Sequence, residues 1–496
     1  MRSSIIRRVI MMLLPLTFSS MAIAQNDFQR IFDEFKKANE KEFADFRDKA
    51  NAEYAEFLRK SWEWFEGKAP IPRPEHKEPV VPPVVAPEED QNHELEDREL
   101  VIEDIVPEAD PVPAPEPIAP ITEVPVPVAK YLAFSIYGTS CSVRYDSSDK
   151  PFLKDSEPNS VAGYWEELGG SEAMDNLLYD CISLRDRMSL CDWAFYKMTE
   201  SMSRTIYPYS QDEASVFQAF VLSQAGFRLR IGYSADDEHL HFLMAAECDM
   251  YGYPYWELDS GHYYLLDGSD VDNMRLVTTD FPESRPMRLT IDDDNLFAEN
   301  LSQSRTLVSE RYSDVTATVR TNLNLIAFYD EYPQSVVNND SRTRWRFYAN
   351  APAGRNVRET LYPQLNKSIS GKSEIEAVEI LLNFVQTSLV YEYDDKIWGT
   401  DRSFFPDESL YYPYCDCEDR SILFSRLVRD LLGLDVALIY YPGHLAAAVK
   451  FTQPVNGDYV SVSGARYTIC DPTYINAPVG LTMPDMDNSS AFVILL

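Results

Sequence analysis

Near the C-terminus, apolar residues recur at helical spacing and then continue as short apolar runs. The apolar positions of residues 418–432 share one helix face: Ile422, Leu423, Leu427, Val428, Leu431 and Leu432. Gly433 follows where a helix C-cap belongs. The runs 435–441, 444–451 and 466–471 predict three strands. The pattern therefore predicts an α+β unit in which one helix packs on an antiparallel sheet.

The same order of elements occurs, more faintly, earlier in the chain. An apolar helix over 212–225 ends at Gly226, and strand-like runs follow at 227–233, 239–242 and 263–268. When Gly226 is laid on Gly433, Ser210 falls opposite Cys417. We therefore predict that the unit occurs twice and that the first copy is degenerate. The alternative is an unrelated α+β domain.

Residues 25–68 are polar except for an aromatic residue at every eleventh position. Two series share this spacing: Phe32, Phe43, Tyr54 and Phe65, and Phe35, Phe46 and Phe57. Eleven residues make three helical turns, so the pattern predicts one long helix with an aromatic stripe. The stripe needs a partner, either this chain itself or another envelope protein. Membrane-surface binding is disfavoured, because the polar face mixes acidic and basic residues.

Proline and acidic residues dominate residues 69–129. This stretch holds 15 of the 32 prolines, which predicts an extended linker without a core of its own. We expect it to act as a spacer, with a short binding motif at residues 94–106 as the alternative.

Two folded regions follow the linker. We expect the degenerate copy to occupy residues 130–283. Residues 284–496 would hold a β-rich segment, with strands at 306–312, 317–323 and 344–348, and then the catalytic unit. An amphipathic helix is predicted over 374–389, and an aromatic loop over 394–414 leads to Cys417 and would shape a cleft.

Three residues of the C-terminal unit have types that suit nucleophilic catalysis. Cys417 precedes the predicted helix, His444 opens a strand and Asp471 ends one, and successive members are 27 residues apart. A cysteine nucleophile needs a base and a group that orients the base. A helix N-terminus lowers a thiol pKa, whereas the carboxylates beside Cys417 act in the opposite direction. The oxyanion donors would be the Cys417 backbone N–H and a tyrosine or Trp398 of the loop.

These residues resemble the core of the transglutaminase-like superfamily. The resemblance covers about residues 373–496 and rests on Cys417 with Ser421, on Gly443-His444 and on Asp471-Pro472-Thr473. It implies a papain-like site of cysteine, histidine and aspartate. The chain departs from the family in having Cys415 where glycine is frequent and alanines where an aromatic residue often follows the histidine.

The N-terminus and the charge indicate the compartment. Residues 1–24 read as a secretory signal, with basic residues, an apolar stretch and an Ala-Ile-Ala cleavage site. No cysteine follows for lipid attachment, and no further run is long enough to span a membrane. A net charge of −35 disfavours binding to nucleic acid. A periplasmic or secreted protein is expected.

Seven cysteines form an odd number in an oxidising compartment. Three disulfides with Cys417 free is the natural interpretation, and pairing of Cys417 with Cys415 or Cys470 is the alternative.

His239, His241 and His262 raise the idea of a metal site. Histidines on one strand are more often surface or core residues, so we predict no metal and no cofactor.

Two classes of function remain open. The first is a cysteine enzyme that acts on peptide or amide bonds through an acyl-enzyme, with hydrolysis favoured over cross-linking. Its partner would be a protein or peptide substrate. The second is a non-catalytic envelope scaffold or binding protein that keeps the fold.

Overall fold

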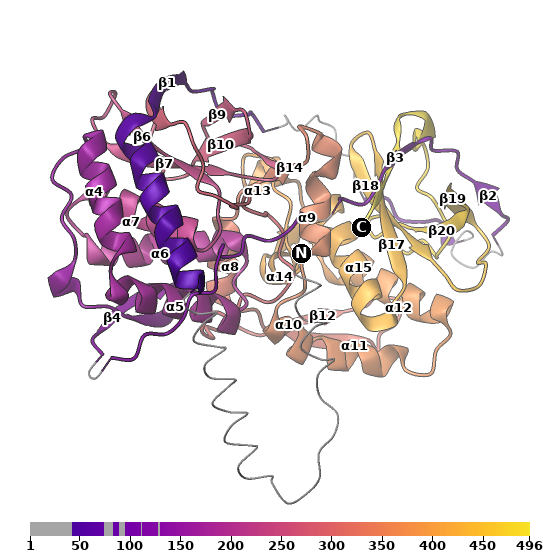
Figure 1. The fold of residues 1–496 in the computed structure, drawn as a ribbon. Helices are drawn as coiled ribbons and strands as arrows, with labels where there is room; N and C mark the ends of the chain where they lie inside the picture. Colours follow the sequence, from indigo (N-terminus) through magenta and orange to yellow (C-terminus); the bar gives the residue numbers. More distant parts are fainter. Residues whose placement is uncertain (1–41, 74–82, 89–94, 111, 127–128) are drawn as a thin grey trace, which may run out of the picture.

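A computed structural model describes residues 42–73, 83–88, 95–110, 112–126 and 129–496. The chain forms two curled, mainly antiparallel sheets, each with helices on one face, and a set of short helices lies between them (Figure 1). One large cluster of buried residues runs along the helix side of both sheets. The predicted α+β class is confirmed. The predicted signal at 1–24 lies outside the described residues.

The first sheet has the strand order β1-β11-β6-β7-β10-β9. Its strands are β1 (Trp62–Glu66), β6 (Leu229–Ser234), β7 (Leu240–Ala245), β9 (Tyr255–Leu258), β10 (Gly261–Leu265) and β11 (Asn273–Val277). The accompanying helices are α4 (Pro158–Gly169), α5 (Glu172–Arg187), α6 (Asp192–Ile206) and α7 (Gln211–Gln224). A hairpin of β4 (Tyr131–Ile136) and β5 (Thr139–Arg144) and a short turn η1 (Ser147–Asp149) precede these helices.

The second sheet has the strand order β2-β19-β20-β18-β17-β21-β3. Its strands are β2 (Arg98–Glu99), β3 (Asp104–Val106), β17 (Asp435–Tyr441), β18 (His444–Lys450), β19 (Asp458–Val462), β20 (Ala465–Cys470) and β21 (Phe492–Leu495). Helices α12 (Glu374–Ser388) and α15 (Cys417–Leu432) pack together, and α15 lies on β17 and β18. Gly433 ends α15 with φ 66°, the left-handed conformation that glycine favours. Both predicted helices are confirmed.

The region between the sheets is mainly helical. Its helices are α8 (Leu323–Asp330), α9 (Arg344–Asn350), α10 (Arg355–Thr360), α11 (Tyr362–Ile369), α13 (Asp394–Ile397) and α14 (Pro406–Tyr411). Its strands are β12 (Arg305–Val308), β13 (Thr316–Val319), β14 (Ser335–Val336), β15 (Val390–Tyr391) and β16 (Tyr414–Cys415), and β14 pairs with β8 (Asp249–Met250). Short turns η2 (Ser341–Thr343) and η3 (Asn488–Ser490) complete the elements. The strand predicted at 344–348 is wrong, because Trp345, Tyr348 and Ala349 are buried at helical spacing as one face of α9.

The two sheets match in strand order and register. The order β11-β6-β7-β10-β9 of the first sheet corresponds to β21-β17-β18-β20-β19 of the second. Corresponding cross-strand pairs are Tyr233 with Leu240 and Tyr440 with Leu445, then Leu243 with Leu265 and Ala448 with Ile469. Helix α7 contacts β7 as α15 contacts β18. The repeated order of elements seen in the sequence is therefore also a repeated topology.

The described part of the predicted N-terminal helix covers residues 42–60 and docks on this chain. Tyr54 is buried and its ring contacts Trp165 and Phe281. Phe46 stays 50% exposed, and Phe65 lies in β1, beyond the end of the helix. Within residues 42–68 the predicted single aromatic stripe is therefore not found, because the docked face carries Ala50, Ala55 and Leu58 beside Tyr54.

The described parts of residues 69–129 pair with both edges of the second sheet, which a simple spacer would not do. β2 pairs with β19 at one edge of the second sheet, and β3 pairs with β21 at the other. Val85 forms a bridge with Ile475, in the turn that follows β20. The segment is extended, as its composition predicts, but it uses its backbone groups to complete a sheet. The division into domains remains a prediction.

The cysteines form no disulfide. All seven are free thiols, and Cys191 is the one that is not fully buried. Cys141 and Cys181 lie against the sulfur atoms of Met188 and Met202, and so behave as small core residues. The three predicted bridges are therefore wrong.

Within the described residues, no helix combines the length and apolar character needed to cross a membrane.

Candidate functional site

His444 and Asp471 meet in a buried hydrogen bond at one end of the second sheet. His444 Nε2 lies 2.8 Å from Asp471 Oδ2. Asp471 Oδ1 accepts hydrogen bonds from the backbone N–H groups of Thr473 and Tyr474, at 2.8 and 3.1 Å. The Nδ1 atom of His444 is buried and has no hydrogen-bond partner. The aspartate therefore fixes one ring nitrogen and leaves the other available as a base.

Cys417 is the first residue of α15, at the same end of the sheet as His444. Its thiol accepts from the backbone N–H of Leu445, the residue that follows His444. Ser421, one turn further along α15, donates to the Leu445 carbonyl oxygen at 2.8 Å. These contacts fix the start of the helix against the start of β18. No hydrogen bond joins the Cys417 thiol to His444 in this closed arrangement, in which Cys417 is 5% exposed.

The environment of Cys417 raises the pKa of its thiol. Burial is the largest cause, followed by the charges of Asp416 and Glu418. Asp416 is also the N-cap of α15, where its carboxylate accepts from the N–H groups of Glu418 and Asp419. The expected benefit of the helix N-terminus is therefore lost, because a carboxylate takes the N–H groups that would stabilise a thiolate. A thiolate at this position would need a cation, such as an imidazolium, to offset the carboxylates.

Several residues that the sequence did not single out hold the site together. Gln386, buried in α12, donates through Nε2 to the carbonyl oxygens of Asp471, Tyr474 and Ala477 at 3.0, 2.8 and 3.2 Å. Arg420 donates to the Leu389 carbonyl oxygen at 2.7 Å. A polar residue within an apolar helix face, such as Gln386, is the signal that could have revealed this role.

Tyr391 is a further residue of the site that sequence reasoning missed. Its hydroxyl is buried without a hydrogen-bond partner, and its ring lies 5.3 Å from the Arg420 guanidinium. Burial and then the charge of Cys417 raise the pKa of the phenol, so the hydroxyl stays protonated close to the thiol. Trp398, the predicted donor, instead packs edge-on against Phe404 and Tyr412.

Five buried carboxyl groups surround the first turn of α15: Asp394, Asp401, Asp416, Glu418 and Asp419. Arg344 forms ion pairs with Asp401 and with Glu418, and Ser403 donates to Glu418 at 2.5 Å. Phe404 N–H donates to Asp419 at 2.8 Å. The loop before Cys417 is thus tied to the nucleophile helix through carboxylates. Burial raises the pKa of Asp394, with the charge of Glu418 as the next cause.

Three of these carboxyl groups could share a cation. Ligand oxygens of Asp394, Asp401 and Glu418 lie within 4.8 Å of one another. Carboxylate oxygens suit Ca²⁺ or Mg²⁺, but Arg344 already neutralises part of this charge. His239, His241 and His262 are not grouped in this way among the described residues, and each is bonded to an aspartate.

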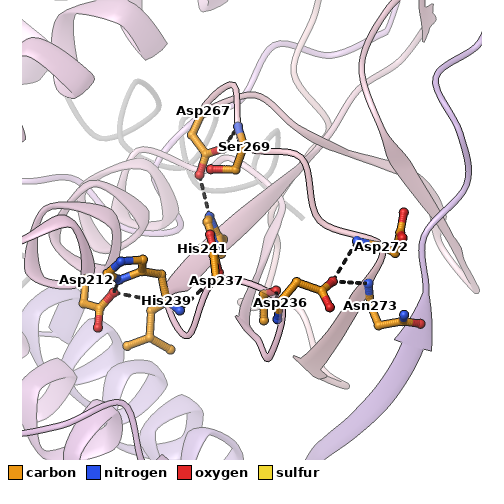
Figure 2. A network of polar contacts seen from close by, with 11 residues as sticks. Asp212, Asp236, Asp237, His239, His241, Asp267, Ser269, Asp272 and Asn273 are labelled. Atoms are coloured by element: carbon orange, nitrogen blue, oxygen red, sulfur yellow. Dashed lines mark hydrogen bonds and ion pairs between the residues drawn. The ribbon is translucent and has the colours of Figure 1, made fainter.

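The first sheet contains residues that correspond in position to His444 and Asp471, with different contacts (Figure 2). His239 directly precedes Leu240, as His444 directly precedes Leu445, and it bonds to Asp212 of α7 at 2.9 Å. Asp267 corresponds to Asp471 in register, but it bonds to His241 Nδ1 at 2.6 Å.

Ser210 stands at the start of α7, where its hydroxyl accepts from the Glu213 backbone N–H. Asp237 occupies the second nitrogen of His241, Nε2, at 3.0 Å (Figure 2). The ring of His241 therefore donates at both nitrogens and cannot act as a base. The first sheet keeps the positions of the triad but not its connections.

A search with models of known protein families found no match to this chain, and a search of curated protein sequences also found none.

Proposed function

We propose that this protein is a transglutaminase-like cysteine enzyme that cleaves peptide or amide bonds with Cys417, His444 and Asp471. The observation that carries the proposal is the His444–Asp471 hydrogen bond of 2.8 Å, which leaves a buried, unpartnered Nδ1 at the end of the sheet where Cys417 begins α15. A fixed imidazole with one free nitrogen beside a thiol is the arrangement that nucleophilic catalysis by cysteine needs.

In the proposed reaction His444 Nδ1 takes the thiol proton, and the Cys417 sulfur attacks the substrate carbonyl carbon. The imidazolium then returns the proton to the leaving amine, and an acyl-enzyme remains. Water, activated by the same imidazole, hydrolyses the thioester and restores the thiol. Asp471 holds the ring and stabilises its charged form. The Tyr391 hydroxyl and the Cys417 backbone N–H are the donors available to the oxyanion.

Substrate binding has to open the site, because the three side chains are almost fully buried: 5% exposed for Cys417, 1% for His444 and 2% for Asp471. The residues before α15 are the entrance in this proposal, since Tyr411, Tyr414 and Val390 are exposed apolar side chains close to the nucleophile helix. An extended peptide with apolar side chains suits that surface.

The same burial supports the second candidate function, a scaffold that keeps the fold without catalysis. The raised pKa of the Cys417 thiol and the absence of a thiol–imidazole hydrogen bond favour it. We prefer the enzyme, because a structural core has no need of a buried imidazole with an unpartnered nitrogen. The proposal includes a periplasmic or secreted location, because residues 1–24 have the pattern of a secretory signal. It also includes an envelope protein as partner for the N-terminal helix.

The test compares the wild-type protein with Cys417→Ala and His444→Ala, and uses Cys191→Ala as a matched control outside the site. Each protein is incubated with an envelope protein extract, and new N-termini are identified by mass spectrometry. We expect new termini with wild type and Cys191→Ala, and none with the two site variants. Equal sets of termini from wild type and Cys417→Ala would leave the scaffold as the function.

A further inference from the structure

Each of the two curled sheets is closed by a short segment from the N-terminal part of the chain. In the first sheet β1 pairs with β11 at one edge, and Lys68, two residues after β1, bridges to Tyr255 at the other edge. In the second sheet β2 lies on one edge and β3 on the other. We call residues 62–68 the first clasp and residues 98–106 the second clasp. Both edges of each sheet are thus joined by a few residues.

The second clasp fills the inner side of the second sheet. Leu100 and Ile102 are buried and belong to a separate core with Ile439, Ala446 and Val460. Val101, between them, points outward and is 70% exposed. Side chains of an extended segment alternate between its two sides. Leu100 and Ile102 therefore fill the inside of the curled sheet, and we call these two residues the plug.

Ion pairs fix both ends of the second clasp. Arg98 donates twice to Asp458, at 2.7 and 2.5 Å, and Arg342 donates twice to Asp104, at 2.7 and 2.6 Å. Paired hydrogen bonds between a guanidinium and a carboxylate set direction as well as position. The clasp therefore has one register on the sheet.

The plugged side of the sheet is also the side on which the catalytic histidine lies. His444 alternates in phase with Ala446 and Ala448, which belong to the inner core. Its cross-strand partner Tyr441 is buried in the same core, and the two rings are nearly parallel, with 6.4 Å between their centroids.

The Tyr441 phenol connects the clasp to the site electrostatically. Burial raises its pKa, the charges of Asp471 and Asp458 raise it further, and Arg98 of the clasp lowers it. The Tyr441 phenol is therefore close enough to feel the charges of Asp471 and of Arg98, the first residue of the second clasp. Loss of the clasp would open the inner core from the side that supports Tyr441 and the imidazole.

We propose that the second clasp is a positioning part of the catalytic centre: Leu100, Ile102 and Arg98 hold Tyr441, and through it the imidazole of His444, in the buried place where Asp471 orients it. This inference rests on the proposed function for its meaning in catalysis. The structural part of the inference is that His444 stays buried only while the second clasp is paired with the sheet. This part can be tested whether or not the protein has enzymatic activity.

The experiment measures hydrogen exchange at the imidazole C2 position of each histidine in the full chain by mass spectrometry. The variant Leu100→Ser/Ile102→Ser removes the plug, and Arg98→Ala removes the ion pair without changing the core. Val101→Ser is the outward-facing control. Phe65→Ser disturbs the first clasp, whose Phe65 packs on the inner core of the other sheet.

We expect exchange at His444 to become at least fivefold faster in Leu100→Ser/Ile102→Ser and about twofold faster in Arg98→Ala, while the buried His241 keeps its rate. Val101→Ser and Phe65→Ser should leave His444 unchanged. A synthetic peptide of residues 95–108 should slow the exchange in the double variant again. Turnover, where wild type has it, should fall at least tenfold with KM unchanged.

Exchange at His444 that is the same in all variants would overturn the inference, whatever the activity. If Leu100→Ser/Ile102→Ser does not fold, the result of Arg98→Ala decides, because its substitution lies at an exposed side chain. Faster exchange in a protein whose wild type shows no thiol-dependent turnover would support the clasp and contradict the proposed function, so the two failures are distinguishable.

Discussion

His239 and His444 lie at corresponding positions of two sheets with the same strand order, yet they bond to carboxylates from different elements. His444 reaches Asp471 across the second sheet, whereas His239 reaches Asp212 in the first turn of α7. The corresponding aspartate of the first sheet, Asp267, is taken by His241. In the first sheet, Asp212 therefore occupies Nδ1 of His239, the ring nitrogen that has no partner in His444.

Introducing a thiol at the corresponding position should not create an active site. In Ser210→Cys we expect the new thiol to react with iodoacetamide no faster than glutathione at pH 7, because Asp212 occupies His239 Nδ1, the nitrogen that is free in His444, and Asp267 is bonded to His241. The rate is measured by labelling and peptide mapping. Alkylation of the introduced thiol more than tenfold faster than that of glutathione would contradict the view that the first site is disconnected.

Asp471→Asn should weaken the activity without abolishing it. An amide can keep the acceptor contact to the N–H of Thr473, but its NH₂ group faces His444 Nε2 and favours the tautomer with the proton on Nδ1. We expect turnover to fall by about 10- to 100-fold, less than in His444→Ala. A melting temperature close to that of wild type would show that the turn is intact. An unchanged turnover would exclude Asp471 from the site.

Asp407 should make the protein less stable as the pH rises. It is buried in α14, Oδ2 accepts from Gly354 N–H at 2.7 Å, Oδ1 has no partner, and burial raises the pKa to about 7. The folded state thus binds more protons than the unfolded state between pH 4 and 7, and stability falls across that range. The effect is on the order of 4 kcal/mol.

The asparagine side chain of Asp407→Asn is uncharged at every pH. The melting temperature of this variant, relative to that of wild type, should therefore rise as the pH is raised from 5 to 8. Asp395→Asn, at an exposed carboxyl group of α13, is the control and should run parallel to wild type. Parallel curves for Asp407→Asn as well would show that the pKa of this carboxyl group is the same in the folded and the unfolded protein.

Gly67 should tolerate no side chain, because the first clasp crosses the sheet there. A Cβ atom would lie 2.8 Å from the Asp272 carbonyl oxygen and 2.8 Å from the Trp256 ring. We expect Gly67→Ala to lower the free energy of unfolding by about 1–3 kcal/mol. Gly163→Ala, in α4 with nothing within 4 Å of the new Cβ, should gain up to about 1 kcal/mol. Denaturant unfolding of both variants is the measurement.

The elements that the sequence predicts well are those defined by local signals. Helix α15 combines an apolar face, an acidic first turn and Gly433, and α12 begins with a complete capping box at Ser373. The hydrogen bond between His444 and Asp471 follows from two strands whose ends meet. The repeat was also visible, because helix, hairpin and aspartate recur in the same order.

What the sequence could not predict depends on distant partners. The second clasp contains strands of two and three residues, and each pairs with a strand more than three hundred residues away. No local pattern encodes such a pairing. The pKa of the Cys417 thiol is a second case, because the role of Asp416 as a cap and the burial of the site become visible only in the folded chain.

The two clasps also affect the order in which the molecule can assemble. Arg98 is synthesised long before its partner Asp458, which follows it by 360 residues, and β3 can pair only after β21 has been made. Contacts of such sequence separation form late, since a long loop must close before they bring any stability. The surroundings of His444 are therefore complete only after β21 has been made, so a chain that lacks Phe492–Leu495 would leave β3 without its partner strand.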